Sequence, residues 1–192
     1  MHSRSTFAIC VASIAVNIAA SLALAESGTP KDYLLQGKQI AIQTRDALGS
    51  KLQQALRDGG PVAAVNFCKD NALPLTQHVA NELGSSVVRV SDRPRNPKNA
   101  ANAEQLLYIS KAKASLAAGE QPKPAIVDSK EHMIGYYPIV TNGMCLQCHG
   151  TPGKEISQET SKAIRASYPL DQATGYGLNE LRGVFVVTME KS

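Results

Sequence analysis

The sequence predicts an α+β domain, a small antiparallel sheet flanked by helices with a long N-terminal helix. Two runs of helical periodicity come first, and four short β-type runs follow, interrupted by further helices; this order favours α+β. The composition, 43% hydrophobic and 19% charged, is typical of a globular chain. Since no Pro/Gly/Ser-rich linker divides residues 26–192, we expect a single domain there.

The first 25 residues have the features of a cleaved signal peptide. Arg4 supplies a positive start, residues 7–20 are mostly apolar, and Ala-Leu-Ala at 23–25 suits cleavage before Glu26. The apolar run is shorter than the ~20 residues that a membrane-spanning helix needs. We therefore expect residues 26–192 to be exported to the periplasm, without a membrane-spanning segment after cleavage.

Two amphipathic helices are predicted at the start of this domain. The first covers 30–57, where apolar residues recur at helical spacing, and a Gly-Gly pair at 59–60 ends it. The second covers 61–83, with proline in a favourable first position. Pro74 is expected to kink or split this second helix, because its ring removes a hydrogen-bond donor and clashes with the preceding turn.

The remaining elements are shorter and are separated by turn-forming residues. Runs rich in β-branched residues predict strands, and longer periodic runs predict helices. Prolines and asparagines between 91 and 102 predict a loop. The predicted elements are strands at 87–90, 125–127, 133–140 and 182–189, and helices at 104–118 and 157–167.

Residues 145–149, Cys-Leu-Gln-Cys-His, form the pattern of c-type haem attachment. The chemistry requires this spacing, since the sulfurs of Cys145 and Cys148 must reach two vinyl groups on one edge of the porphyrin. His149 then lies under the iron and supplies an axial nitrogen. The pattern predicts one covalent haem c per chain, bound by these three residues.

Three other interpretations compete with haem. Cys145 and Cys148 could form a structural disulfide, act as a thioredoxin-like redox pair, or supply half of a zinc site. A redox pair is expected within a βαβ unit, which the predicted elements do not form. Zinc needs two more ligands, and the sequence has no second CxxC or H-x₃₋₅-H pattern. Export also favours haem attachment.

The residue that would bind the iron as its sixth ligand is not identified by residue spacing. Cys10 leaves with the signal peptide, so Cys68 has no cysteine partner and is either a small buried hydrophobe or an axial thiolate. His78 and Met133 are further candidates, although His78 is expected at the surface. Spacing alone does not choose among Cys68, His78 and Met133.

Four sequence blocks resemble the bacterial c-haem PAS-like domains catalogued as a domain of unknown function. Members of that family occur as stand-alone exported haem proteins and as sensor domains of membrane histidine kinases. The matching blocks, in order, are Ala64–Cys68, Val88–Ser91 with Arg95–Asn99, Tyr136–Ile139 with Cys145–Gly150, and Tyr168–Tyr176 with Arg182 and Gly183.

This resemblance implies a PAS-like fold, haem attached through Cys145 and Cys148, and His149 as one axial ligand. It also implies Cys68 as the other ligand, because the family's ligand cysteine occupies the matching place. A thiolate ligand favours ferric iron and a low reduction potential. Protonation or reduction would release it and open a site for a diatomic gas.

Arginines near the loop at 91–102 are candidates for binding the haem propionates. Arginine forks suit carboxylates, so we hypothesise that Arg93 or Arg95 pairs with one propionate. Asn96, Pro97 and Asn99 are expected to shape the turn.

Two classes of function remain: an electron-transfer cytochrome with a redox partner, or a redox or gas sensor acting through a separate protein such as a kinase. We favour the first, because this chain shows no output domain. The net charge of +4 is too small and too evenly spread to favour nucleic acid. We expect no enzymatic activity, since the sequence shows no distinctive distal acid–base group.

Overall fold

The computed structural model describes residues 28–191, and the predicted signal peptide at 1–25 lies outside them. Its helices and strands follow the predicted order closely. They are α1 (Pro30–Glu82), β1 (Ser86–Val90), the 3₁₀ turn η1 (Pro97–Asn99), α2 (Ala103–Ala117), β2 (Ala125–Asp128), β3 (His132–Val140), α3 (Gly143–His149), α4 (Gln158–Ser167) and β4 (Leu181–Glu190).

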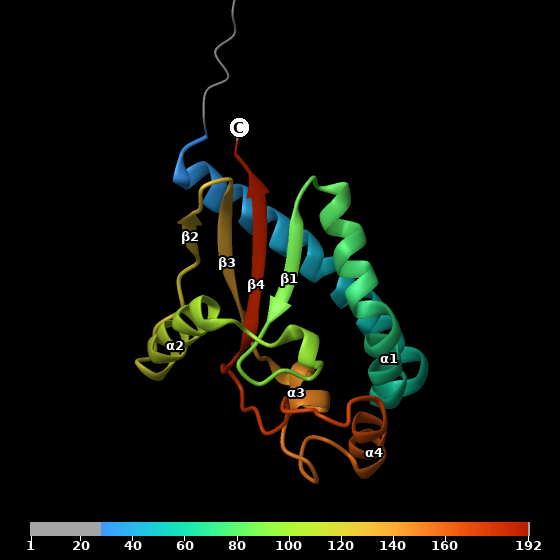
Figure 1. The fold of residues 1–192 in the computed structure, drawn as a ribbon. Helices are drawn as coiled ribbons and strands as arrows, with labels where there is room; N and C mark the ends of the chain where they lie inside the picture. Colours follow the sequence, from blue (N-terminus) through green and yellow to red (C-terminus); the bar gives the residue numbers. More distant parts are fainter. Residues whose placement is uncertain (1–27, 192) are drawn as a thin grey trace, which may run out of the picture.

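The four strands form one antiparallel sheet in the order β1-β4-β3-β2 (Figure 1). The C-terminal strand therefore lies inside the sheet, between β1 and β3. Helices lie on both sides of the sheet, and α3 and α4 lie at the end opposite the C-terminus (Figure 1). The predicted fold class, an α+β domain with a small antiparallel sheet and a long N-terminal helix, is confirmed.

The long helix α1 consists of two arms joined at Gly59 and Gly60. Both glycines leave helical angles, and Gly60 has a φ of 67°, in the left-handed region that glycine adopts at little cost. The break between two helices was therefore predicted correctly. Of the two effects expected of Pro74, a kink or a split, the split does not occur, because α1 keeps helical angles through Pro74 to Glu82.

Each face of the sheet packs against a different helix. Tyr137, Phe185 and Val187 point toward the first arm of α1, with Ile40 and Met189 in the same cluster. The alternate residues of the strands point the other way, toward α2, and form a second cluster: Tyr136, Val184, Val186, Ile109 and Ala112. This alternation is the period of two that a sheet buried on both faces requires.

Gly37 is the point of closest approach between α1 and the sheet. A Cβ added there would overlap the hydroxyl of Tyr137 and lie 2.9 Å from its Cζ, while that hydroxyl donates to the Leu34 carbonyl at 3.0 Å. Tyr137 is buried and cannot move aside freely. We expect Gly37→Ala to lower the free energy of unfolding by ~1–3 kcal/mol through overpacking.

Gly49, in the same arm of α1, is the matched control for that substitution. A Cβ at Gly49 meets no atom within 4 Å. Because alanine favours a helix over glycine, Gly49→Ala is expected to raise stability by about 0.5–1 kcal/mol. Urea unfolding followed by circular dichroism measures both, and a Gly37→Ala protein as stable as the Gly49→Ala protein would contradict this packing.

Two further features bear on the sequence predictions. The loop between β1 and α2 contains η1, whose cap is Asn96: its Oδ1 accepts a hydrogen bond from the Lys98 backbone at 3.0 Å, as the predicted turn role requires. The helix α3 at 143–149 was not predicted. Within residues 28–191, no helix is both long and apolar enough to cross a membrane.

Candidate cofactor-attachment site

The Cys-x-x-Cys-His motif forms the short helix α3, at the end of the sheet opposite the C-terminus (Figure 1). Asn142 begins this helix, and its side-chain oxygen accepts a hydrogen bond from the Cys145 backbone at 3.3 Å. Cys145 and Cys148 are three residues apart in the helix and so share one face. His149 is the last residue of α3 and follows directly on the second thiol.

Both motif cysteines are free, partly buried thiols, and neither is in a disulfide. Cys148 packs against an apolar cluster that contains Val65 of α1 and Ile164 of α4. Burial raises the pKa of Cys148 to about 11, so the group is a protonated thiol at neutral pH. Among residues 28–191, no three His, Cys, Asp or Glu side chains are grouped to hold a metal ion.

One hydrogen bond fixes the orientation of the His149 ring. Its Nδ1 lies 2.7 Å from the Ala173 carbonyl oxygen. A carbonyl only accepts, so Nδ1 carries the proton and the lone pair is on Nε2. Arg182 Nε lies 3.3 Å from the same Nδ1, but two N–H groups cannot bond each other, so this is a contact without a hydrogen bond. Burial, with the nearby charge of Arg182, lowers the pKa of His149 well below its usual value.

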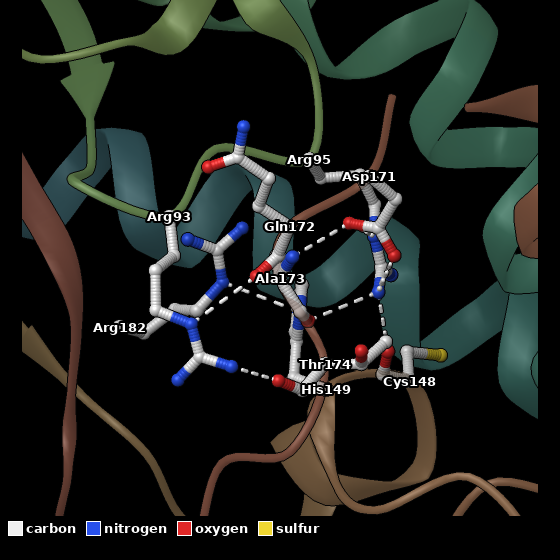
Figure 2. Close-up of polar contacts among 9 residues, drawn as sticks. All are labelled: Arg93, Arg95, Cys148, His149, Asp171, Gln172, Ala173, Thr174 and Arg182. Atoms are coloured by element: carbon white, nitrogen blue, oxygen red, sulfur yellow. Dashed lines mark hydrogen bonds and ion pairs between the residues drawn. The ribbon is translucent and has the colours of Figure 1, made fainter. Parts of the chain in front are cut away.

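The loop that follows α4 is tied to the end of α3 by backbone hydrogen bonds. The amide of Tyr176 donates to the His149 carbonyl at 2.9 Å, and the amide of Gly175 donates to the Gly150 carbonyl at 2.7 Å. These bonds place the Ala173 carbonyl beside the histidine ring (Figure 2). The backbone of His149 and its ring are therefore both held by this loop.

Arg95 is the centre of a buried polar network beside the motif (Figure 2). Its Nε and Nη2 lie 3.2 Å from the two carboxylate oxygens of Asp171. Nη2 also donates to the Cys148 carbonyl at 2.6 Å and to the Ala173 carbonyl at 3.2 Å. The side chains of Arg95 and Asp171 are only 11% and 8% exposed. Arg95 thus joins the loop at 91–102 to both α3 and the loop beyond α4.

Arg93 contacts the same loop from the other side (Figure 2). Its Nε donates to the Gln172 carbonyl at 3.2 Å, and its Nη2 donates to the Thr174 carbonyl. Its guanidinium also lies over the ring of Tyr176, 4.4 Å from the ring centre. Arg95 contacts the motif directly, and Arg93 contacts the loop that holds His149. The pairing of one of them with a propionate stays a prediction.

The three candidates for the sixth ligand lie in different parts of the fold. His78 is 67% exposed and pairs with Glu82, and Met133 is buried in the cluster between the sheet and α1. Cys68 lies on the second arm of α1, one turn beyond Val65, which packs with Cys148. Cys68 is therefore the candidate that lies nearest along the chain to a residue packed against the motif.

Three residues of this region were quoted in the blocks that carry the resemblance but were not predicted to act at the site: Asp171, Tyr176 and Arg182. Arg182 lies where the pairing of β3 with β4 slips, since Ile139 pairs with Gly183 and Val140 with Leu181. Such a bulge redirects a side chain, and here it directs Arg182 toward His149. The rings of Tyr176 and His149 are edge to face, 6.3 Å apart. The resemblance is therefore the signal that could have pointed to all three residues.

Comparison with known proteins identifies the family. The model of the Tll0287-like family matches residues 28–190. The crystal structure of the cyanobacterial heme-protein Tll0287 has the same fold, with a TM-score of 0.60 and 22% identity over 85% of this chain and 97% of that chain. No curated protein matches. These findings bear out the resemblance to c-haem PAS-like domains. Because the family model spans nearly all the described residues, the chain belongs to the Tll0287-like family.

Proposed function

We propose that this chain is an exported haem protein that carries one covalent haem c and serves in redox or electron-transfer chemistry in the periplasm. The observation that carries the proposal is the state of His149. Its Nδ1 proton is directed at the Ala173 carbonyl, which leaves the Nε2 lone pair for a metal. This is the tautomer that an axial histidine needs, next to two free thiols on one helical face.

The residues present fit a haem c. The thiols of Cys145 and Cys148 would each add across one vinyl group, and His149 would supply an axial nitrogen. Cys68 would supply a second iron ligand, which agrees with its place on α1 one turn beyond Val65, in whose cluster Cys148 packs. When bound, the haem supplies an iron atom that accepts and releases one electron. The chain's contribution is to orient the histidine and to surround the site with arginines.

The positive surroundings of Cys68 support a thiolate ligand. Burial raises the pKa of the free Cys68 thiol, while the positive charges of Arg89 and Arg95 lower it. Bound to ferric iron, the sulfur would lose its proton, and the two guanidinium groups would then stabilise the negative charge. We therefore expect a low-potential haem whose ferric form is favoured.

Absorption and EPR spectra of the exported protein, oxidised and reduced, test this proposal. We expect low-spin ferric haem with a sulfur ligand in the wild type. In Cys68→Ser, the sulfur signature is expected to disappear, while the covalent haem stays attached. His78→Ala is the matched control and should leave both spectra unchanged, because His78 is exposed on the same helical arm.

Two results would count against parts of this function. A Cys68→Ser spectrum identical to that of the wild type would remove Cys68 as the ligand. Rapid CO binding to the reduced wild-type protein, with loss of the sulfur ligand and a change of shape, would contradict the electron-transfer role and favour a gas sensor.

A further inference from the structure

One carbonyl oxygen beside the motif accepts two hydrogen bonds. The Ala173 oxygen lies 2.7 Å from His149 Nδ1 and 3.2 Å from Arg95 Nη2, and both nitrogens donate to it (Figure 2). A carbonyl oxygen has two lone pairs, so these two donors occupy both. Ala173 is 0% exposed, and water therefore does not compete for this oxygen. The histidine and the guanidinium thus share a single buried acceptor.

Asp171 fixes both sides of this arrangement. Its two carboxylate oxygens lie 3.2 Å from Arg95 Nε and Nη2, and its Oδ1 also accepts a hydrogen bond from the Ala173 amide at 2.8 Å. One carboxylate therefore holds both the guanidinium and the residue whose carbonyl faces His149. Because the side chains of Arg95 and Asp171 are nearly inaccessible, solvent screens this pair little, and the guanidinium stays at the carbonyl.

We propose that Arg95 is a positioning residue that acts on His149 through the Ala173 carbonyl and raises the reduction potential of the haem. This inference rests on the proposed function, in which His149 binds the iron. A carbonyl that already accepts a hydrogen bond from a cation has less electron density to attract a second proton. The Nδ1 proton therefore stays more firmly on the ring of His149.

The consequence for the iron follows from how an outer hydrogen bond tunes a histidine ligand. A strong bond from Nδ1 makes the imidazole more basic, and a weakened bond makes it less so. A less basic ring donates less charge through Nε2, and this favours ferrous over ferric iron. Arg95 would then offset part of the opposite effect expected of a thiolate ligand.

The midpoint potential and the EPR g values of the haem-loaded protein test this inference. In Arg95→Met, one lone pair of the Ala173 oxygen is released, so the hydrogen bond from His149 becomes stronger. We expect the equilibrium constant for reduction to fall about tenfold, or ~59 mV for one electron, a size typical of losing an outer partner of a metal ligand. The g values should shift as well, because the histidine becomes a stronger donor.

Two further variants separate the hydrogen bond from charge alone. The double variant Arg95→Met/Asp171→Asn keeps the net charge of the site and leaves no buried charge unpaired, so it is expected to fold even if Arg95→Met alone does not. It should keep most of the loss in potential and the shift in g values, because Arg95 bonds the carbonyl oxygen itself. Lys113→Met is the matched control. It breaks another ion pair of the loop at 91–102, with Asp92, and should leave the g values unchanged.

Each unfavourable result has a distinct meaning. A double variant with the potential of the wild type would show that Arg95 acts only through its charge, and this would overturn the inference. Unshifted g values in Arg95→Met, with a potential that differs from the wild type only over a range of pH, would place Arg95 on a haem propionate and would also overturn it. A wild-type protein without covalent haem would defeat the proposed function instead, before any variant is compared.

Discussion

Replacing both Cys145 and Cys148 by serine is expected to abolish covalent haem attachment. Each thiol would form one thioether, and serine cannot replace it. The helix itself should persist, because Asn142 still caps it and the amide of Tyr176 still donates to the His149 carbonyl. Haem-dependent staining of the denatured protein in a gel measures the loss, and each single serine variant should keep one thioether and a shifted haemochrome band.

Cys68→Ser is the matched control for that experiment. Like each serine substitution in the motif, Cys68→Ser removes one partly buried thiol. It should retain full staining, since Cys68 is proposed to bind the iron and not the porphyrin. Staining of the double variant at the wild-type level would show that neither motif cysteine holds the haem covalently.

Asp171→Ala is expected to produce the largest loss of stability among substitutions near the site. It would leave the guanidinium of Arg95 buried beside Cys148 without its carboxylate, and it would remove the acceptor for the Ala173 amide at 2.8 Å. Breaking a buried ion pair by removing one partner costs about 3–5 kcal/mol. Since both side chains are nearly inaccessible, solvent would screen little of this effect. Urea unfolding measures it directly.

Asp46→Ala supplies the comparison, because it breaks another Arg–Asp pair at the surface. Arg45 and Asp46 are 63% and 61% exposed, and exposed ion pairs contribute about 0–1 kcal/mol. Equal losses in the two variants would contradict the structural role assigned to Asp171.

Most of the fold could be predicted because the relevant signals are local. The Gly-Gly pair at 59–60 separates the two arms of α1, and each predicted strand lies within one residue of the observed one at either end. The second arm is not split at Pro74, because this arm is packed at Val65, Ala72 and Ala80 and continues as a helix. Tertiary packing here outweighs the local cost of the proline.

Of the candidate site, only the Cys-x-x-Cys-His motif could be predicted from the sequence. Cys145, Cys148 and His149 are adjacent in sequence, so their proximity needs no tertiary information. The Arg95–Asp171 pair joins residues 76 apart, and Arg182 faces His149 through a bulge in the β3–β4 pairing. Neither hydrophobic periodicity nor residue spacing carries such information. The helix α3 was missed although Asn142 offered a cap signal, because its seven residues are too few for a periodic pattern.

The intact mass of the exported, matured protein after extraction with acidic acetone tests the central claim most directly. We expect one haem on each chain, starting at residue 26, with both motif thiols consumed and no pigment in the extract. A chain with the mass of the polypeptide alone, and haem recovered in the acetone, would contradict covalent attachment through Cys145 and Cys148.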